Sequence, residues 1–137
     1  EGLLSNLKRI VKNKKLAKNV IFLGKLGDRK LLDLLKKAQF FVSASDHEGF
    51  GISVLEAMAA GCPVVVNDVN SFRGFIKNGK NGFIVNYSEP KVVADSILRI
   101  KNKDLNVISR EAKKSAKDYD WHNIVKSIEK VYDECIK

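Results

Sequence analysis

Four short, continuously apolar runs divide this chain and constrain its fold more than any other feature. They occupy residues 19–24, 40–44, 62–67 and 83–85. Strands that are buried on both faces of a parallel sheet read as unbroken Val/Ile/Phe runs, whereas half-exposed strands alternate apolar and polar residues. Helical patterns separate the runs. This alternation predicts a Rossmann-like, doubly wound parallel α/β sheet of about four strands, with helices on both faces.

Apolar residues at helical spacing mark the segments between these runs. The pattern predicts helices at about residues 2–14, 27–38 and 52–60, and a short helical turn at 72–78. After Pro90 we expect helices alone, at about residues 90–100, 105–117 and from Tyr119-Asp120-Trp121 onward. The chain therefore changes from alternating strands and helices to a helical C-terminal part.

Length and composition indicate one folded domain. The chain has 137 residues, 45% of them hydrophobic and 30% charged, with two prolines. Cys62 and Cys135 lie far apart and outside any Cys/His cluster, so neither a disulfide framework nor a metal site is predicted. No apolar run approaches the ~20 residues that span a bilayer, and we expect a cytoplasmic protein. Because the chain begins with Glu1 rather than Met, we also expect a fragment.

The net charge of +9 attracts anions in general. Nucleic acid, acidic lipid and phosphorylated metabolites all satisfy this condition, so charge does not choose among them. Lysines cluster at residues 12–18 and 113–117 with helical spacing. We interpret both clusters mainly as solvated helix faces, with a partner-binding patch as the alternative.

The stretch from residue 43 to 63 carries the features of a ligand site. A strand runs into a loop with Glu48, Gly49 and Gly51, and the next helix carries Glu56 in its second turn. Ligands of such sheets bind beyond the carboxyl ends of the strands. Glycines let the backbone turn sharply, and the free N–H groups at the start of a helix attract phosphate. Ser53 or the glycine turn itself is expected to cap this helix.

The two glutamates admit several interpretations. A carboxylate pairs well with two adjacent hydroxyls such as those of a ribose, because it accepts hydrogen bonds through both oxygens. Each glutamate alone could equally be an ordinary exposed acid. A pair of glycosidase-type carboxylates is a further alternative, since the sequence does not determine the distance between them.

The motifs of this stretch resemble those of retaining glycosyltransferases of the GT-B architecture, family four (group 1). The hallmark of that family is two glutamates separated by seven residues, and Glu48 and Glu56 have this spacing. The segment at 55–65 and the runs at 20–24, 79–85 and 119–121 are similar to the family as well. The resemblance covers nearly the whole chain.

The resemblance implies that residues 1–137 are a partial C-terminal, donor-binding domain. Two strands before the first helix, a basic Arg/Lys pair and the N-terminal acceptor domain would be absent. The intact enzyme would transfer a sugar with retention from a UDP-, GDP- or ADP-sugar to a glycan, lipid or polysaccharide-precursor acceptor. It would need no metal or other cofactor, and would contact at most the inner face of the cytoplasmic membrane. The fragment alone would be inactive, and nucleic acid is not an expected partner.

The resemblance also assigns roles residue by residue. Glu48 would bind hydroxyls of the donor sugar as the catalytic position, and Glu56 would hold the ribose. The backbone amides that would face the sugar and diphosphate are those of Gly49, Phe50, Gly51 and Ile52. The backbone that would contact the base is that of Gly24, Lys25 and Leu26. The Phe50 side chain could also form a wall of the site.

Some residues depart from the family pattern or have ordinary explanations. Gly74 stands where the family usually has an acid, which leaves the sugar contacts open. Arg73 is a candidate phosphate ligand, with a surface role favoured. His47 and Lys80 are interpreted as loop and turn residues. Rival functions are a GT-B epimerase or phosphorylase, and a basic module that binds nucleic acid or anionic membrane. Without two central strands, the runs at 20 and 41 must pair with each other, pair with another chain or leave an open edge.

Overall fold

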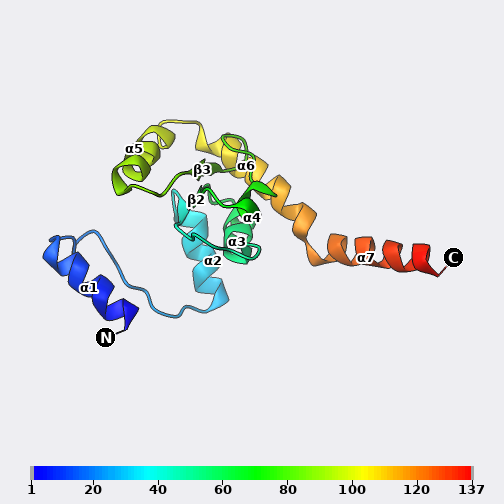
Figure 1. Ribbon diagram of the computed structural model, residues 1–137, viewed down its shortest axis with the longest axis horizontal. Coiled ribbons are helices and arrows are strands. Elements are labelled where there is room, and N and C mark those ends of the chain that lie inside the picture. The colour runs from blue at the N-terminus through cyan, green and yellow to red at the C-terminus, as the bar shows by residue number, and fades with distance from the viewer. Residues whose placement is uncertain (1, 137) are drawn as a thin grey trace. The chain divides into compact units, whose positions relative to one another are not determined.

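The computed structural model describes residues 2–136, and Figure 1 gives their order of helices and strands. Contacts within the chain divide it into two compact units, Glu1–Lys30 and Leu31–Lys137. The first unit holds helix α1 (Leu3–Asn13), and helix α2 (Asp28–Lys37) spans the boundary. Both helices lie within one or two residues of the predicted bounds.

The predicted strand at residues 19–24 is wrong. Residues 20–23 have no regular secondary structure, and Ile21 is 80% exposed. The Lys8 ammonium lies 6.0 Å from the centre of the Phe22 ring, within the first unit. An apolar run becomes a strand when a neighbouring strand accepts and donates its backbone hydrogen bonds. Within the described residues of the first unit no strand forms beside this run, so its composition alone does not produce one.

The second unit contains a parallel sheet of three strands, in the order β1 (Phe41–Ser43), β2 (Val64–Asn67) and β3 (Phe83–Val85). Val42 pairs with Val65, and Val66 pairs with Ile84. All three strands were predicted, although about four were expected. Within the second unit, β1 has a single strand neighbour, so an open edge is the outcome found there.

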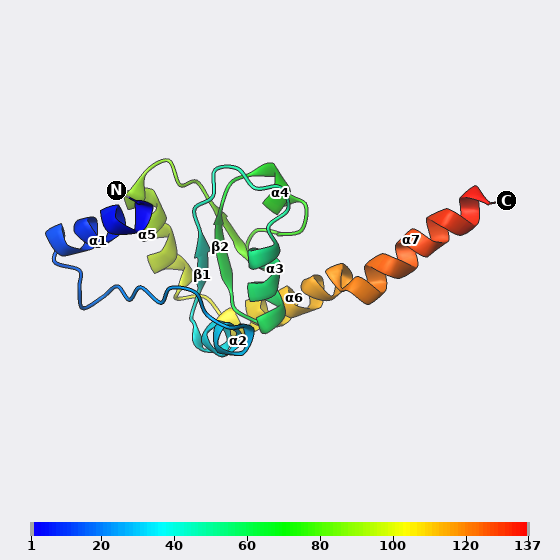
Figure 2. The same ribbon diagram turned by 90° about the horizontal axis from the view of Figure 1, so that it is seen from below.

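Side chains of β2 alternate between two hydrophobic clusters. Val64 and Val66 pack with residues of helix α3 (Ile52–Ala60) and with Phe72 of the short helix α4 (Asn70–Arg73). Val65 packs in the second cluster, with Ile100 at the end of helix α5 (Pro90–Ile100). Figure 2 shows α3 and α4 on one side of the strands and α5 on the other. The sheet is therefore doubly wound, which confirms the predicted fold class.

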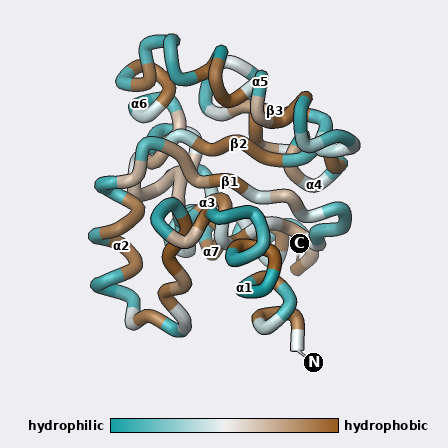
Figure 3. The backbone as a smooth tube through the Cα atoms, turned by 90° about the vertical axis from the view of Figure 1, so that its left-hand side faces the viewer, coloured by the Kyte–Doolittle hydropathy of each residue, from teal (hydrophilic) through white to brown (hydrophobic). Residues whose placement is uncertain are grey.

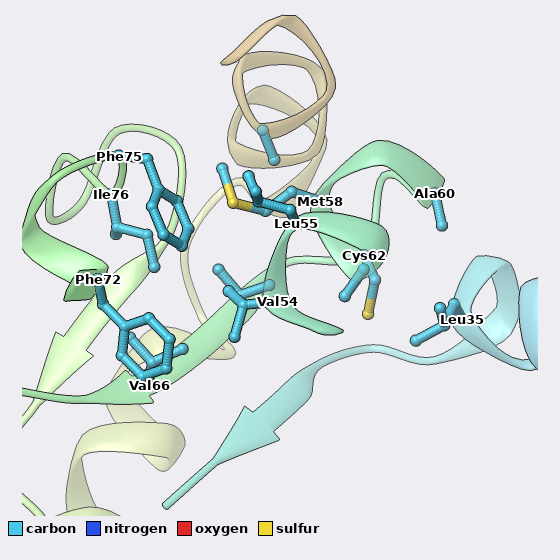
Figure 4. Packing of buried hydrophobic residues seen from close by; sticks show 13 residues of the cluster. Leu35, Val54, Leu55, Met58, Ala60, Cys62, Val66, Phe72, Phe75 and Ile76 are labelled. Carbon is cyan, nitrogen blue, oxygen red and sulfur yellow. The ribbon is translucent and has the colours of Figure 1, made fainter. Parts of the chain in front are cut away.

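Burial on both faces explains why β2 is hydrophobic along its length, as Figure 3 shows. The first cluster, drawn in Figure 4, fills the space between α3 and the sheet. Its members include Met58 and Phe72, and neither has accessible surface. Burial also raises the pKa of the Cys62 thiol, whose sulfur lies 3.7 Å from the Ala38 carbonyl oxygen. Cys62 is therefore a packing residue.

Helices form the rest of the second unit, as predicted. Helix α6 (Leu105–Ala116) contributes Ala112 to the first cluster and Ile108 to the second. A 3-10 turn, η1 (Lys117–Tyr119), leads to helix α7 (Trp121–Cys135), in which no residue is buried. The short helix predicted at 72–78 begins earlier, at Asn70, and ends before Gly74. No helix among residues 2–136 has the length and apolarity needed to cross a membrane.

Candidate functional site

A pocket of about 530 Å³ opens at the carboxyl ends of β1 and β2. The loop after β1 and the loop after β2 form its two walls. Its lining residues are Asp46, His47, Glu48, Gly49, Asp68, Val69, Asn70 and Ser71. The pocket therefore lies at the edge of the sheet where ligands of this fold are expected.

Carboxylates dominate the chemistry of this pocket. Asp46, Glu48 and Asp68 contribute to the lining. His47, which follows Asp46 in the sequence, lines the pocket as well. Glu48 is half-buried, whereas Asp46 and Asp68 are exposed. Carboxylates accept hydrogen bonds and repel phosphate, so these walls suit a ligand that presents hydroxyl groups. No group of three or more potential metal ligands occurs among residues 2–136.

The glycine turn leads directly into α3. Gly51 is the N-cap residue of the helix, with φ 98° and ψ 46°, and no side chain caps the helix. The glycine turn, not Ser53, therefore starts α3, and its first N–H groups remain available to a ligand. A Cβ atom at Gly51 would lie 2.6 Å from Cε1 of Phe72. A Cβ atom at Gly49 would meet nothing within 4 Å.

The Phe50 side chain packs against aromatic residues and does not line the pocket. Its ring centre lies 5.7 Å from that of Tyr119 and 6.0 Å from that of Phe75. Both partners belong to the first hydrophobic cluster or pack against it. These contacts anchor the glycine turn, and because Phe50 is 47% exposed, its role as a wall of the site stays a prediction. The proposed role of its backbone amide stays a prediction.

The remaining predicted residues lie in different places. Ile52 and Glu56 occupy the exposed face of α3, one turn apart, and neither lines the pocket. The structure thus brings Glu48 and Gly49 to the pocket with residues 68–71 and leaves Glu56 on the exposed face of the helix, outside the lining. Gly24, Lys25 and Leu26 belong to the first unit, and Gly24 has φ 64°. Their contact with the base stays a prediction.

Arg73 forms an ion pair with Asp68. Its Nε donates to Oδ1 of Asp68 at 2.6 Å, and its Nη2 donates to Oδ2 at 2.7 Å. These hydrogen bonds lower the pKa of the Asp68 carboxyl and raise the pKa of Arg73. The guanidinium that was a candidate phosphate ligand is therefore engaged by Asp68, and the Arg73 side chain is 61% exposed. The structure therefore favours the surface role.

Sequence reasoning missed several residues of the pocket. Asp46, Asp68, Asn70 and Ser71 line it, but none belongs to the two-glutamate motif. It also missed Asn67, whose side chain bonds the loops after all three strands. One signal was present, because Asn67 is a polar residue that closes an otherwise apolar strand.

Comparison with known proteins adds the family. Residues 1–119 match the family model described as "Glycosyl transferases group 1". An uncharacterized glycosyltransferase of Methanocaldococcus jannaschii is 39% identical over 116 residues, which are 82% of this chain and 30% of the relative. The GDP-mannose:cellobiosyl-diphosphopolyprenol alpha-mannosyltransferase of Xanthomonas campestris is 34% identical over 100 residues, 71% of this chain and 26% of that protein.

A solved structure has the same fold. Sucrose-phosphate synthase from Thermosynechococcus elongatus superposes with a TM-score of 0.86 at 22% identity, over 96% of this chain and 34% of that one. The chain thus spans about a third or less of the length of these proteins. Its α/β sheet corresponds to the Rossmann-like C-terminal half of a GT-B glycosyltransferase. The chain belongs to the glycosyl transferases group 1 family.

Proposed function

We propose that this chain is the donor-binding part of an enzyme that transfers a sugar, with retention, from a nucleotide-diphosphate sugar. The observation that carries the proposal is the placement of Glu48 and Gly49 in the pocket, directly before the uncapped start of α3. The Glu48 carboxylate can accept hydrogen bonds from sugar hydroxyls, and the free N–H groups at the start of α3 can bind phosphate. A nucleotide-diphosphate sugar offers both kinds of group.

In this proposal the residues divide the donor between them. Glu48 accepts hydrogen bonds from hydroxyls of the sugar, while the amides of Gly49 to Ile52 receive the sugar and diphosphate. Glu56, on the exposed face of α3, holds the ribose, and the backbone at Gly24, Lys25 and Leu26 contacts the base. Preorganised N–H groups stabilise the charge that develops on the departing diphosphate, so no metal is needed.

Relatives support the class of donor and acceptor. The name of the Xanthomonas campestris relative gives a GDP-sugar as donor and a lipid-linked sugar diphosphate as acceptor. We propose a nucleotide sugar and a glycan, lipid or polysaccharide-precursor acceptor for this protein too. The acceptor binds to a part of the protein outside these 137 residues, at the inner face of the cytoplasmic membrane if it is lipid-linked. The chain alone is proposed to be inactive.

Donor binding tests the proposal in the full-length protein. Ligand-observed NMR with UDP-, GDP- and ADP-sugars should show one preferred nucleotide, and the matching nucleoside diphosphate should compete. Turnover should release that diphosphate without a divalent metal and keep the anomeric configuration of the sugar. Binding of none of these donors contradicts the proposal. A steeply salt-dependent affinity for nucleic acid, regardless of the sugar, would favour the basic binding module instead.

Two variants separate the roles of the glutamates. Glu56→Ala should weaken binding of the nucleoside diphosphate itself by about 1.5–3 kcal/mol, the range for a hydrogen bond to a charged group. Glu48→Ala should weaken binding of the sugar nucleotide. It should not change the affinity for the nucleoside diphosphate that lacks the sugar. Glu129→Ala, on the exposed surface of α7, is the matched control. Unchanged diphosphate affinity in Glu56→Ala removes Glu56 from the site.

A further inference from the structure

We propose that Asn67 is the positioning residue of the donor pocket, because its side chain holds together the loops that form the two walls. This inference rests on the proposed function, since it concerns the geometry of the same pocket. Asn67 is the last residue of β2, the central strand, and does not itself line the pocket.

The Asn67 amide makes four hydrogen bonds. Its Nδ2 donates to the Ser45 carbonyl oxygen at 3.2 Å and to Oδ1 of Asp46 at 3.1 Å. Its Oδ1 accepts from the backbone N–H groups of Asp68 at 2.9 Å and Tyr87 at 3.1 Å. A primary amide offers two N–H donors and one oxygen with two lone pairs, so its capacity is fully used.

These bonds define the orientation of the amide. If the amide were reversed, its oxygen would face the Ser45 carbonyl and the Asp46 carboxylate, which are both acceptors. Its NH₂ group would then face two N–H donors. All four contacts would become unfavourable, so the network admits one orientation. Asn67 is therefore a fixed reference point for the loops around it.

The partners of Asn67 belong to the loops after all three strands. Ser45 and Asp46 lie three and two residues before Glu48, so the two donated bonds hold the start of the wall that carries the proposed sugar ligand. Asp68 begins the opposite wall. Tyr87 follows β3, and its hydroxyl also donates to the Val65 carbonyl oxygen at 3.1 Å. Beyond the pairing of β1 with β2, the Asn67 side chain thus ties the two walls to each other and to the loop after β3.

Asn81 provides a comparison within the same chain. It is 2% exposed, and its Nδ2 donates to the Phe75 carbonyl oxygen at 2.9 Å and to the Ser115 hydroxyl at 2.8 Å. Its Oδ1 accepts from the Lys77 amide at 2.7 Å. Asn81 thus ties the segment before β3 to helix α6. It lies at the amino end of β3, whereas the pocket opens at the carboxyl ends of β1 and β2. Removing either side-chain amide should lower stability. Only the removal of the Asn67 amide, and not that of Asn81, should also alter the pocket.

The experiment compares Asn67→Ala with Asn81→Ala in the full-length protein. Both the dissociation constant for the preferred sugar nucleotide and the thermal midpoint are measured. A binding site whose groups are held about 1 Å too loosely no longer matches its ligand, so we expect the affinity of Asn67→Ala for the sugar nucleotide to fall by about tenfold or more. The folded fraction of Asn81→Ala should bind with an affinity within about twofold of the wild type.

A second pair of variants keeps the shape of the side chain. Asn67→Asp retains the two accepted bonds but loses both donors and faces the Asp46 carboxylate. We expect it to bind the donor as weakly as Asn67→Ala. Adding Asp46→Asn exchanges donor and acceptor and restores an amide–carboxylate pair. The double variant should therefore bind several-fold more tightly than Asn67→Asp alone, a coupling that two independent effects would not produce.

The outcomes separate this inference from the proposed function. If the wild-type protein binds no sugar nucleotide, the proposed function fails. If the wild type binds and Asn67→Ala binds equally well, Asn67 does not position the pocket. The inference also fails if Asn81→Ala loses as much affinity as Asn67→Ala at equal stability, or if the double variant shows no recovery.

Discussion

At the scale of single residues, the two glycines of the turn have different surroundings. Gly51 has φ 98°, and its missing Cβ would collide with the Phe72 ring. Gly49 has open space around its Cα and a φ outside the positive region. The fold therefore requires glycine at 51, while a requirement at 49 would come from a ligand that approaches the backbone.

Gly51→Ala should lower the free energy of unfolding by about 2 kcal/mol or more, because it combines a strained φ with a steric collision. Gly49→Ala should change it by less than about 0.5 kcal/mol. Chemical denaturation of the two variants measures the difference. In the full-length protein, Gly49→Ala should weaken donor binding without changing stability. Equal destabilisation by the two substitutions would contradict this account.

The Asp68–Arg73 pair gives a prediction about pH. The pKa of Asp68 is lower in the folded protein than its ordinary value of 3.8. The pair therefore stabilises the fold above that value, and its contribution is lost as pH falls through the lowered folded pKa. The thermal midpoint of Arg73→Gln should lie slightly below that of the wild type at neutral pH, and the gap should narrow below about pH 4. A difference in thermal midpoint that grows as the pH falls would contradict the predicted direction of the pH dependence.

At the scale of elements, the contrast is between strands with different numbers of neighbours. β2 pairs on both sides and is buried on both faces, while β1 has one strand neighbour within the second unit. Composition predicted both strands equally well. It also predicted one at residues 19–24, where residues 20–23 have no regular secondary structure. Apolar sequence is thus a condition for a buried strand, and pairing decides whether it forms.

Val65→Ala should cost about 2 kcal/mol or more of unfolding free energy, since it removes two methyl groups from a fully buried position. Val42→Ala is the matched control, because Val42 pairs with Val65 but is 48% exposed. Urea unfolding of both variants measures the ratio of the two losses. A larger loss at Val42 would mean that another surface covers β1 in solution.

At the scale of the whole molecule, backbone amides close to the two hydrophobic clusters should be the best protected from hydrogen exchange. Hydrogen exchange measures this protection amide by amide, because exchange requires local opening. We expect the slowest exchange in β2 and α3 and the fastest at residues 20–24, which have no regular secondary structure. Helix α7, without a buried residue, should exchange faster than α6. Strong protection at 20–24 would show that this run pairs with a strand in solution.

The sequence by itself determined the helices and the three paired strands, and it placed Glu48 and Gly49 in the loop after β1. Helical periodicity, the apolar runs of β1 to β3 and glycines at both ends of α3 act locally, so they could be recognised without a structure. The spacing of Glu48 and Glu56 indicated the family for the same reason.

Tertiary structure alone decided which run pairs, where the Phe50 ring packs, and that Arg73 meets Asp68. It also decided that Asn67 joins loops 20 to 22 positions away along the chain. Apart from the Asp68–Arg73 pair, which spans five positions, these outcomes depend on contacts between segments distant in sequence, whose strength local composition does not encode.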